Sequence, residues 1–276
     1  MDGSIIFDFS SKIVENSILS FGVAISLIAF FSCAVLSNFS VKEMVFSCLF
    51  VSIFGIVFGS IAHYVFYYND YRIIEEHMPY YFKICNLAFF KDNTIGFSDD
   101  AWMSDHGLIL GVIVGCLFSS FMFKISFLKL LDCTISSICL LLCSFRLLDL
   151  LKVRNFGVPT EKSYGIIFSK IDYLPRHATM MYEFILLLIT FFVILYIFKK
   201  FDFNISCQSR YGFLFFLGLL FIYMSKVIVG LLKVQDNILP NPVSDFFKLG
   251  IDQFLAISFL MLSLIFVIYK FPKVED

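Results

Sequence analysis

Seven long apolar runs constrain the fold of this chain more than any other feature. Each is close to the length of roughly 20 residues that a helix needs to cross a hydrocarbon core of about 30 Å. The runs lack the alternation of apolar and polar residues that marks a membrane β-barrel. The sequence therefore predicts an all-α, polytopic membrane protein, with helices near residues 17–36, 44–67, 107–123, 128–151, 182–198, 211–232 and 251–270.

The composition favours the same class. Of the 276 residues 59% are hydrophobic and 16% are charged, and the mean hydropathy is +0.88. Soluble domains carry about 25% charged residues. The formal net charge of −1 gives no basic face for nucleic acid, so no such partner is expected. The chain shows no repeat, so we expect residues 1–276 to form a single membrane-embedded domain, and no removable signal peptide is indicated.

The orientation follows from the short loops between the runs. The basic residues that fall on one side of the seven runs are Lys42, Lys124, Lys129, Lys199, Lys200, Arg210, Lys270 and Lys273. The positive-inside rule places that side in the cytoplasm. We therefore expect the N-terminus outside and the C-terminus in the cytoplasm, with the segments near 68–106, 152–181 and 233–250 facing outward.

Small residues within the runs indicate where helices pack closely, because they let two backbones approach. They include Gly55, Gly59, Gly111, Gly115 and Gly218. Cysteines in or beside the runs behave as small apolar residues. Cys139 and Cys143 share a helical face, but no histidine lies near them in sequence to complete a metal site. Structural thiols are expected.

His106 lies in Met103–Gly107, where an aqueous loop runs into the third apolar run. An imidazole at such a place is well suited to proton chemistry, as a general base or a hydrogen-bond donor. A helix cap or a solvated side chain would also explain it. The residues alone leave these interpretations open.

Two cations lie within the apolar runs and need anionic partners. Arg146 stands five residues before the end of the fourth run, where Asp149 at i+3 could form an internal ion pair. A lipid phosphate is the other candidate, since the planar guanidinium suits it. Lys226 lies about two-thirds along the sixth run, far from either end. The two cations together favour an anionic ligand.

Several motifs, in this order, resemble the prolipoprotein diacylglyceryl transferase family over nearly the whole chain. Tyr64–Asn69, otherwise typical of an interfacial aromatic belt, resembles the family's Y-V-x-F-Y-N, and Met103–Gly107 resembles M-S-F-H-G-G. Arg146 to Gly157 fits G-R-x-G-N-F-x-N-x-E-x-x-G without a gap. The most specific match is Leu174-Pro175-Arg176-His177 with Tyr182-Glu183, which resembles L-P-R-H-P-S-Q-L-Y-E.

The chain also departs from the family pattern. Phe145 and Leu148 replace glycines, and Asp149 replaces an asparagine. The remaining differences are Arg154 for glutamate, Leu108 for glycine, Ile61 for arginine, Lys226 for arginine and Gly230 for glutamate. A bulky side chain in place of glycine would crowd a lipid headgroup near the backbone.

The resemblance implies an enzyme of the bacterial cytoplasmic (inner) membrane, with phosphatidylglycerol as donor and the lipobox cysteine of a preprolipoprotein signal peptide as acceptor. It implies no cofactor and no metal. His106 would deprotonate or hydrogen-bond the thiol, Arg146 would hold the donor phosphate, and Lys226 would assist as a point charge. The other residues that it assigns to substrate binding or to the outer mouth are Tyr64, Asp149, Gly157, Arg176, His177 and Glu183.

Two alternatives remain. The replaced glycines, together with Lys226 and Gly230, are also compatible with a degenerate homologue that binds lipid or lipoprotein without transfer. A small-solute transporter is less well supported, because the chain has neither an internal repeat nor a pair of interrupted helices.

Overall fold

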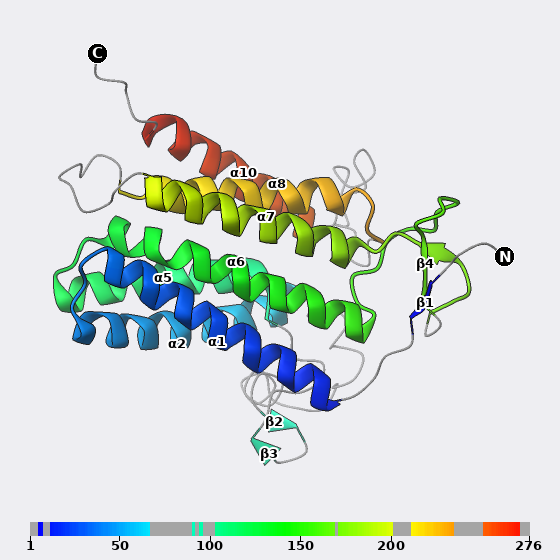
Figure 1. Ribbon diagram of the computed structural model, residues 1–276, viewed down its shortest axis with the longest axis horizontal. Coiled ribbons are helices and arrows are strands. Elements are labelled where there is room, and N and C mark those ends of the chain that lie inside the picture. Colours follow the sequence, from blue (N-terminus) through cyan, green and yellow to red (C-terminus); the bar gives the residue numbers. More distant parts are fainter. Residues whose placement is uncertain are drawn as a thin grey trace. The chain divides into compact units, whose positions relative to one another are not determined.

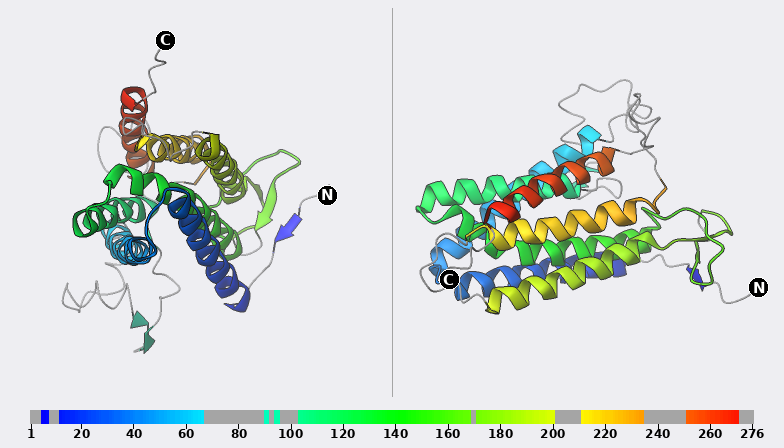
Figure 2. Two further views of the ribbon diagram at one scale, coloured as in Figure 1. Left: turned by 60° about the vertical axis from the view of Figure 1, so that its left-hand side comes forward. Right: turned by 90° about the horizontal axis from the view of Figure 1, so that it is seen from above.

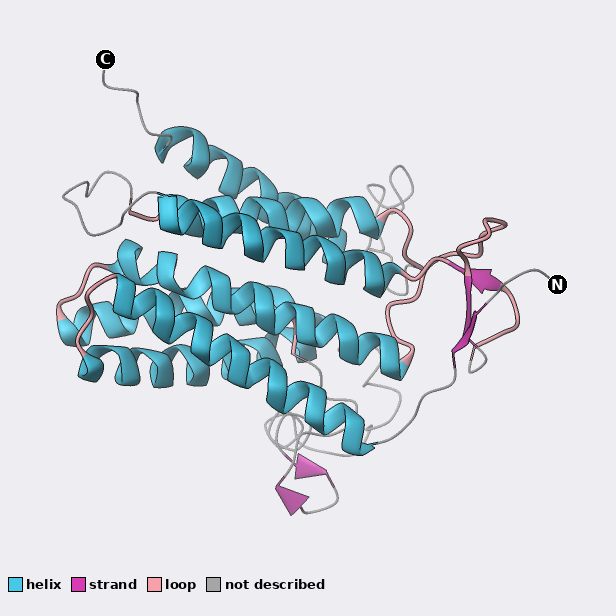
Figure 3. Cartoon of the chain, viewed as in Figure 1, coloured by secondary structure: helices cyan, strands magenta, loops and turns pink. Residues whose placement is uncertain are grey.

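The computed structural model describes residues 5–7, 12–66, 90–91, 94–95, 103–168, 171–200, 211–234 and 251–270 (Figures 1 and 3). Its helices are α1 (Lys12–Leu36), α2 (Val41–Phe66), α5 (Asp105–Phe123), α6 (Phe127–Lys152), α7 (Thr179–Lys200), α8 (Phe213–Gly230) and α10 (Ile251–Lys270). Each predicted run coincides with one of them. Within these ranges, 6 helices are long and apolar enough to cross a membrane, and α10 contains a shorter apolar stretch, Gln253–Tyr269. The all-α, polytopic prediction is confirmed.

The chain divides into two compact units. Residues 39–130 form one, and residues 1–38 together with 131–276 form the other. The expected single domain stays a prediction, as do the sides of the membrane on which the termini lie.

In the unit of residues 39–130, α2 and α5 pack through glycines. A Cβ on Gly111 would lie 2.2 Å from the carbonyl oxygen of Phe54, and one on Gly107 would lie 2.4 Å from that of Phe58. Gly115 meets the backbone of Val51 in the same way, at 2.7 Å. A spacing of four residues aligns these positions on one face of α5. The predicted close packing is confirmed, because the missing side chains let the two backbones touch.

In the other unit, α6 packs against α1 through small and weakly polar side chains. The Sγ of Cys33 lies 3.4 Å from the Oγ of Ser136, and the Oγ of Ser137 donates to the carbonyl of Ser26 at 2.8 Å. A Cβ on Gly22 would fall 1.9 Å from the Oγ of Ser144. Figure 2 shows α6, α7 and α8 running side by side in this unit.

A buried carboxylate joins α6 to α8. Asp132 is 1% exposed, and its Oδ2 accepts from the backbone N–H of Gly212 at 2.7 Å. Its Oδ1 accepts from the N–H of Phe215 at 2.8 Å. The first N–H groups of a helix lack partners within the helix and carry partial positive charge, so an anion there is favourable. Asp132 thus caps α8 from a neighbouring helix.

Short strands lie outside the helices, and the sequence did not predict them. β1 (Ile5–Phe7) runs parallel to β4 (Ile166–Phe168), and β4 pairs antiparallel with β5 (Pro175–Arg176). A separate antiparallel pair joins β2 (Phe90–Lys91) to β3 (Thr94–Ile95). Between β1 and β4 the described residues include four helices long and apolar enough to cross a membrane. An even number of crossings returns a chain to the side where it began, so the pairing of β1 with β4 agrees with each of these helices spanning the membrane.

Candidate functional site

A buried cluster of charges lies where α6 nears its end and α7 begins. The Nη1 of Arg146 donates to Oδ2 of Asp149 at 2.6 Å, and its Nε lies 3.1 Å from Oε2 of Glu183. The three side chains are 8%, 5% and 9% exposed, respectively. The internal pair with Asp149 that the sequence left open is therefore present, and Glu183 adds a carboxylate from α7.

The turn after α6 folds back onto this cluster. The Nδ2 of Asn155 donates to Oδ2 of Asp149 at 2.9 Å, and the hydroxyl of Thr179 donates to the carbonyl of Asn155. Val153 and Asn155 have φ of 53° and 54°, in the left-handed region that often ends a helix. A β-branched residue rarely adopts that region, so the local backbone at Val153 is strained. Sequence analysis missed Asn155, because nothing in the local pattern predicts this reversal.

Arg176 binds the segment that carries it rather than an open site. Its Nη2 lies 2.5 Å from Oδ2 of Asp172, and its Nη1 donates to the carbonyl of Gly157 at 3.2 Å. The guanidinium carbon stands 5.3 Å from the ring centroid of Phe156. Hydrogen bonds from Arg176 hold the pKa of Asp172 below its usual value, and the same bonds raise the pKa of Arg176. Asp172 was not predicted.

Gly157 allows three backbone segments to meet. A Cβ there would lie 2.6 Å from both the Cβ and the carbonyl oxygen of His177, and 2.8 Å from the carbonyl oxygen of Leu232. The N–H of Gly157 donates to His177 at 2.9 Å, and the N–H of Val158 donates to Leu232 at the same distance. Any side chain at 157 would push these segments apart.

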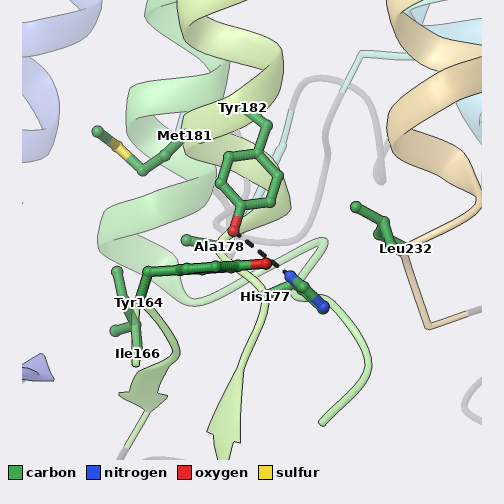
Figure 4. A pocket seen from close by; sticks show the side chains of 7 residues that line it. All are labelled: Tyr164, Ile166, His177, Ala178, Met181, Tyr182 and Leu232. Carbon is green, nitrogen blue, oxygen red and sulfur yellow. Dashed lines mark hydrogen bonds between the residues drawn. The ribbon is translucent and has the colours of Figure 1, made fainter. Parts of the chain in front are cut away.

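A cavity of about 490 Å³ lies beside this junction, and Figure 4 shows its lining residues, which are Tyr164, Ile166, His177, Ala178, Met181, Tyr182 and Leu232. The hydroxyls of Tyr164 and Tyr182 both point toward the imidazole of His177. The Nδ1 of His177 lies 3.4 Å from the hydroxyl of Tyr182. Tyr164 and Leu232 belong to none of the motifs, so no sequence pattern predicted them.

The remaining predicted site residues lie elsewhere on the chain. His106 is the second residue of α5 and is 4% exposed, so it is buried rather than solvated, and the helix cap is Ser104 instead. Lys226 is half-buried on α8, one turn before Gly230. Tyr64 lies in the last turn of α2, and its side chain is outside the described part of the structure. His106 belongs to the unit of residues 39–130, whereas the charged cluster, Gly157 and the cavity belong to the other.

The side-chain amide of Gln253 lies directly beside Gly230. A Cβ on Gly230 would lie 2.8 Å from Nε2 of Gln253 in α10. Gln253 is 8% exposed, and its Oε1 has no hydrogen-bond partner among the described residues. The amide therefore fills the space where a larger residue at 230 would project.

Comparison with known proteins agrees with these motifs. The family described as prolipoprotein diacylglyceryl transferase matches residues 9–269. A phosphatidylglycerol–prolipoprotein diacylglyceryl transferase of Rickettsia felis is 26% identical over 273 residues, covering 98% of this chain and 97% of the relative. One from Bacteroides fragilis is 26% identical over 225 residues, covering 81% and 77%. One from Pseudoalteromonas atlantica is 29% identical over 159 residues, covering 58% and 51%. Since the match extends over nearly all of its length, the chain belongs to the prolipoprotein diacylglyceryl transferase family.

Proposed function

We propose that this chain transfers the diacylglyceryl group of phosphatidylglycerol to the thiol of a preprolipoprotein's lipobox cysteine, within a bacterial cytoplasmic (inner) membrane. The observation that carries the proposal is the family match over residues 9–269. Relatives with this activity in their names match with coverage up to 98% of the chain. The preserved order of the motifs around His106, Arg146 and His177 supports it further. The acceptor is the signal-peptide form of the lipoprotein, and no cofactor or metal is needed.

The reaction is a substitution at a glyceryl carbon. The cysteine thiol loses its proton, its sulfur bonds to that carbon, and the bond from carbon to the phosphate oxygen breaks. The electron pair leaves with glycerol-1-phosphate, and the product is a thioether. The thiolate is the reactive form, and a free thiol is mostly protonated at neutral pH. We assign His106 to accept the thiol proton, a role compatible with its buried position in the first turn of α5.

We assign Arg146 to the charge that develops on the departing phosphate. Asp149 and Glu183 engage its Nη1 and Nε and thereby fix the direction of the guanidinium plane. A phosphate would then displace the more distant carboxylate, that of Glu183, from the guanidinium. Lys226 would add a second positive charge. Tyr64 would contact substrate, and Gly157, Arg176 and His177 would shape the outer mouth.

A complementation assay in living bacteria tests this function. In bacteria depleted of their own transferase, the intact chain should restore lipidation of a reporter lipoprotein. His106→Ala and Arg146→Ala should abolish the rescue at unchanged membrane levels, whereas the exposed cation change Lys199→Ala should preserve it. An intact chain that reaches the membrane and restores no lipidation would refute the proposal.

A lipid-binding homologue without transfer is the second candidate. The observation in its favour is that Arg146 already contacts two carboxylates of its own chain. Such a protein would retain phosphatidylglycerol on purification but release no glycerol-1-phosphate when an acceptor peptide is added. Detection of the thioether by mass spectrometry would eliminate this candidate.

A further inference from the structure

The described lining of the cavity beside Gly157 carries no cation that could pair with a phosphate. None of the described residues that line it is Lys or Arg. Arg176 is adjacent to His177 in the chain, but its guanidinium is held by Asp172 and by the carbonyl of Gly157. A lipid phosphate therefore finds no cation among the described lining residues.

The cavity instead combines an apolar floor with hydrogen-bonding groups. Ile166, Ala178, Met181 and Leu232 supply the apolar surface, and its volume of about 490 Å³ falls within the range of ligand sites. His177 and Tyr182 supply an imidazole and a hydroxyl that can each donate or accept. Tyr164 is 58% exposed and so stands at the opening. A ligand that suits both features has an apolar side chain attached to a polar main chain.

We infer that this cavity binds an apolar side chain of the acceptor polypeptide close to its reactive cysteine, an inference that rests on the proposed function. Its position fits this occupant. His177 and Ala178 directly precede α7, and Leu232 follows α8 within two residues, so the cavity lies where the helices end. A peptide that leaves the bilayer at this level would present its side chain to the apolar floor and its main-chain groups to His177 and Tyr182.

An acyl chain is the main competing occupant. It would suit the apolar floor, but it has no group that could bond His177 or the tyrosine hydroxyls. The Nδ1 of His177 contacts the Tyr182 hydroxyl, but the remaining donor and acceptor positions of these groups would face hydrocarbon without a partner, which costs free energy. The polypeptide is therefore favoured, and the acyl chain becomes an outcome of the test.

Gly157 lies outside the cavity lining and determines how closely two of its lining segments approach each other. It packs against the backbone of both His177 and Leu232, which are lining residues on different segments. The family motif that ends at Gly157 and the motif that contains His177 thus meet at one wall. Gly157, His177 and Leu232 act here as specificity-determining positions rather than as catalytic residues.

Photocrosslinking in membranes tests the occupant directly. The full-length chain would carry p-benzoylphenylalanine at position 232, with the adjacent position 231 as control, since Leu231 is 72% exposed and is not part of the lining. The probe is a synthetic peptide that contains an apolar residue next to a cysteine, in phosphatidylglycerol vesicles. An adduct to the peptide from 232 and not from 231 is expected. Adducts to lipid alone, or no peptide adduct, would overturn the inference.

Kinetics with paired peptides give a second readout. Leu232→Trp should raise the KM for a leucine-containing peptide by roughly 10-fold, the size of effect that filling a hydrophobic pocket gives, without changing the KM for phosphatidylglycerol. Leu232→Ala should favour a peptide with a bulkier apolar side chain, and Leu231→Trp should change neither constant. An equal loss for every peptide with Leu232→Trp would argue against a side-chain pocket. If the chain crosslinks the peptide but forms no thioether, the proposed transfer fails and the pocket assignment stands.

Discussion

The α2–α5 interface and the charged cluster of α6 and α7 join helices in opposite ways. Between α2 and α5, glycines such as Gly107 and Gly111 remove side chains so that backbones touch. Between α6 and α7, a guanidinium reaches across to Glu183 while it also holds Asp149. In the α2–α5 interface an added Cβ would clash with backbone atoms. In the charged cluster the loss of the Arg146 side chain would break its ion pairs with both carboxylates.

This difference shows which contacts local sequence can encode. The glycines recur at a spacing of four within one helix, so a single segment predicts the contact face. Arg146 and Glu183 lie on separate helices, and their pairing depends on how these helices pack. Four substitutions test how strongly such contacts contribute to stability, and they follow in order of decreasing effect.

Removing Arg146 should have the largest effect. Arg146→Leu removes the guanidinium from its contacts with two buried carboxylates, and breaking a buried ion pair costs about 3–5 kcal/mol. Thermal unfolding of the purified protein in detergent would measure the loss. Neutralising the partners as well, with Asp149→Asn and Glu183→Gln in the same chain, should recover much of the stability. A single variant as stable as the wild type would contradict the importance of the cluster.

Adding one carbon at the α2–α5 contact should come next. Gly111→Ala places a Cβ 2.2 Å from a backbone oxygen of α2, and overpacking of this kind costs about 1–3 kcal/mol. Gly55→Ala is the matched control in the same interface, because its Cβ would meet a Leu108 side-chain carbon at 3.3 Å, which can move. Thermal unfolding should therefore separate the two alanines. Equal unfolding temperatures would contradict backbone contact at Gly111.

Asp132 offers a buried carboxylate that accepts hydrogen bonds from helix N–H groups. Asp132→Ala should destabilise the protein by roughly 1–2 kcal/mol through loss of the cap of α8. Asp132→Asn keeps one acceptor oxygen and should lose less. Hydrogen exchange at Gly212 and Phe215 would locate the effect, and unchanged protection of both amides in the alanine variant would refute the cap.

The pair of Asp172 and Arg176 should give the smallest effect, because Asp172 is partly exposed. The pKa of Asp172 is lowered by its hydrogen bonds to Arg176, so its contribution is present above the ordinary pKa of about 3.9 and disappears as the pH falls through the folded-state value. The stability difference between wild type and Asp172→Asn should therefore shrink below pH 4. A difference that stays constant from pH 7 to pH 3 would contradict the assigned cause.

Much of the fold followed from the sequence, but the site followed only in part. Hydropathy predicted each helix of the described residues, because a bilayer demands long apolar segments regardless of packing. Strands of two or three residues, such as β5, leave no comparable pattern. Asp149 was one of two candidate partners predicted for Arg146, because helical spacing brings the two side chains together. Asn155, Asp172, Tyr164 and Leu232 were missed, since their contacts depend on a chain reversal or on segments distant in sequence.

The parallel pairing of β1 with β4 also bears on biosynthesis. Ile5 pairs with Ile166, so the first strand emerges long before its partner has been made. At typical translation rates of about 5–20 residues per second, that delay lasts roughly 8–32 s. During that time the leading segment has no neighbour from its own chain in this sheet. A bulky fusion placed directly ahead of it would therefore interfere with late assembly more than one attached to the opposite terminus.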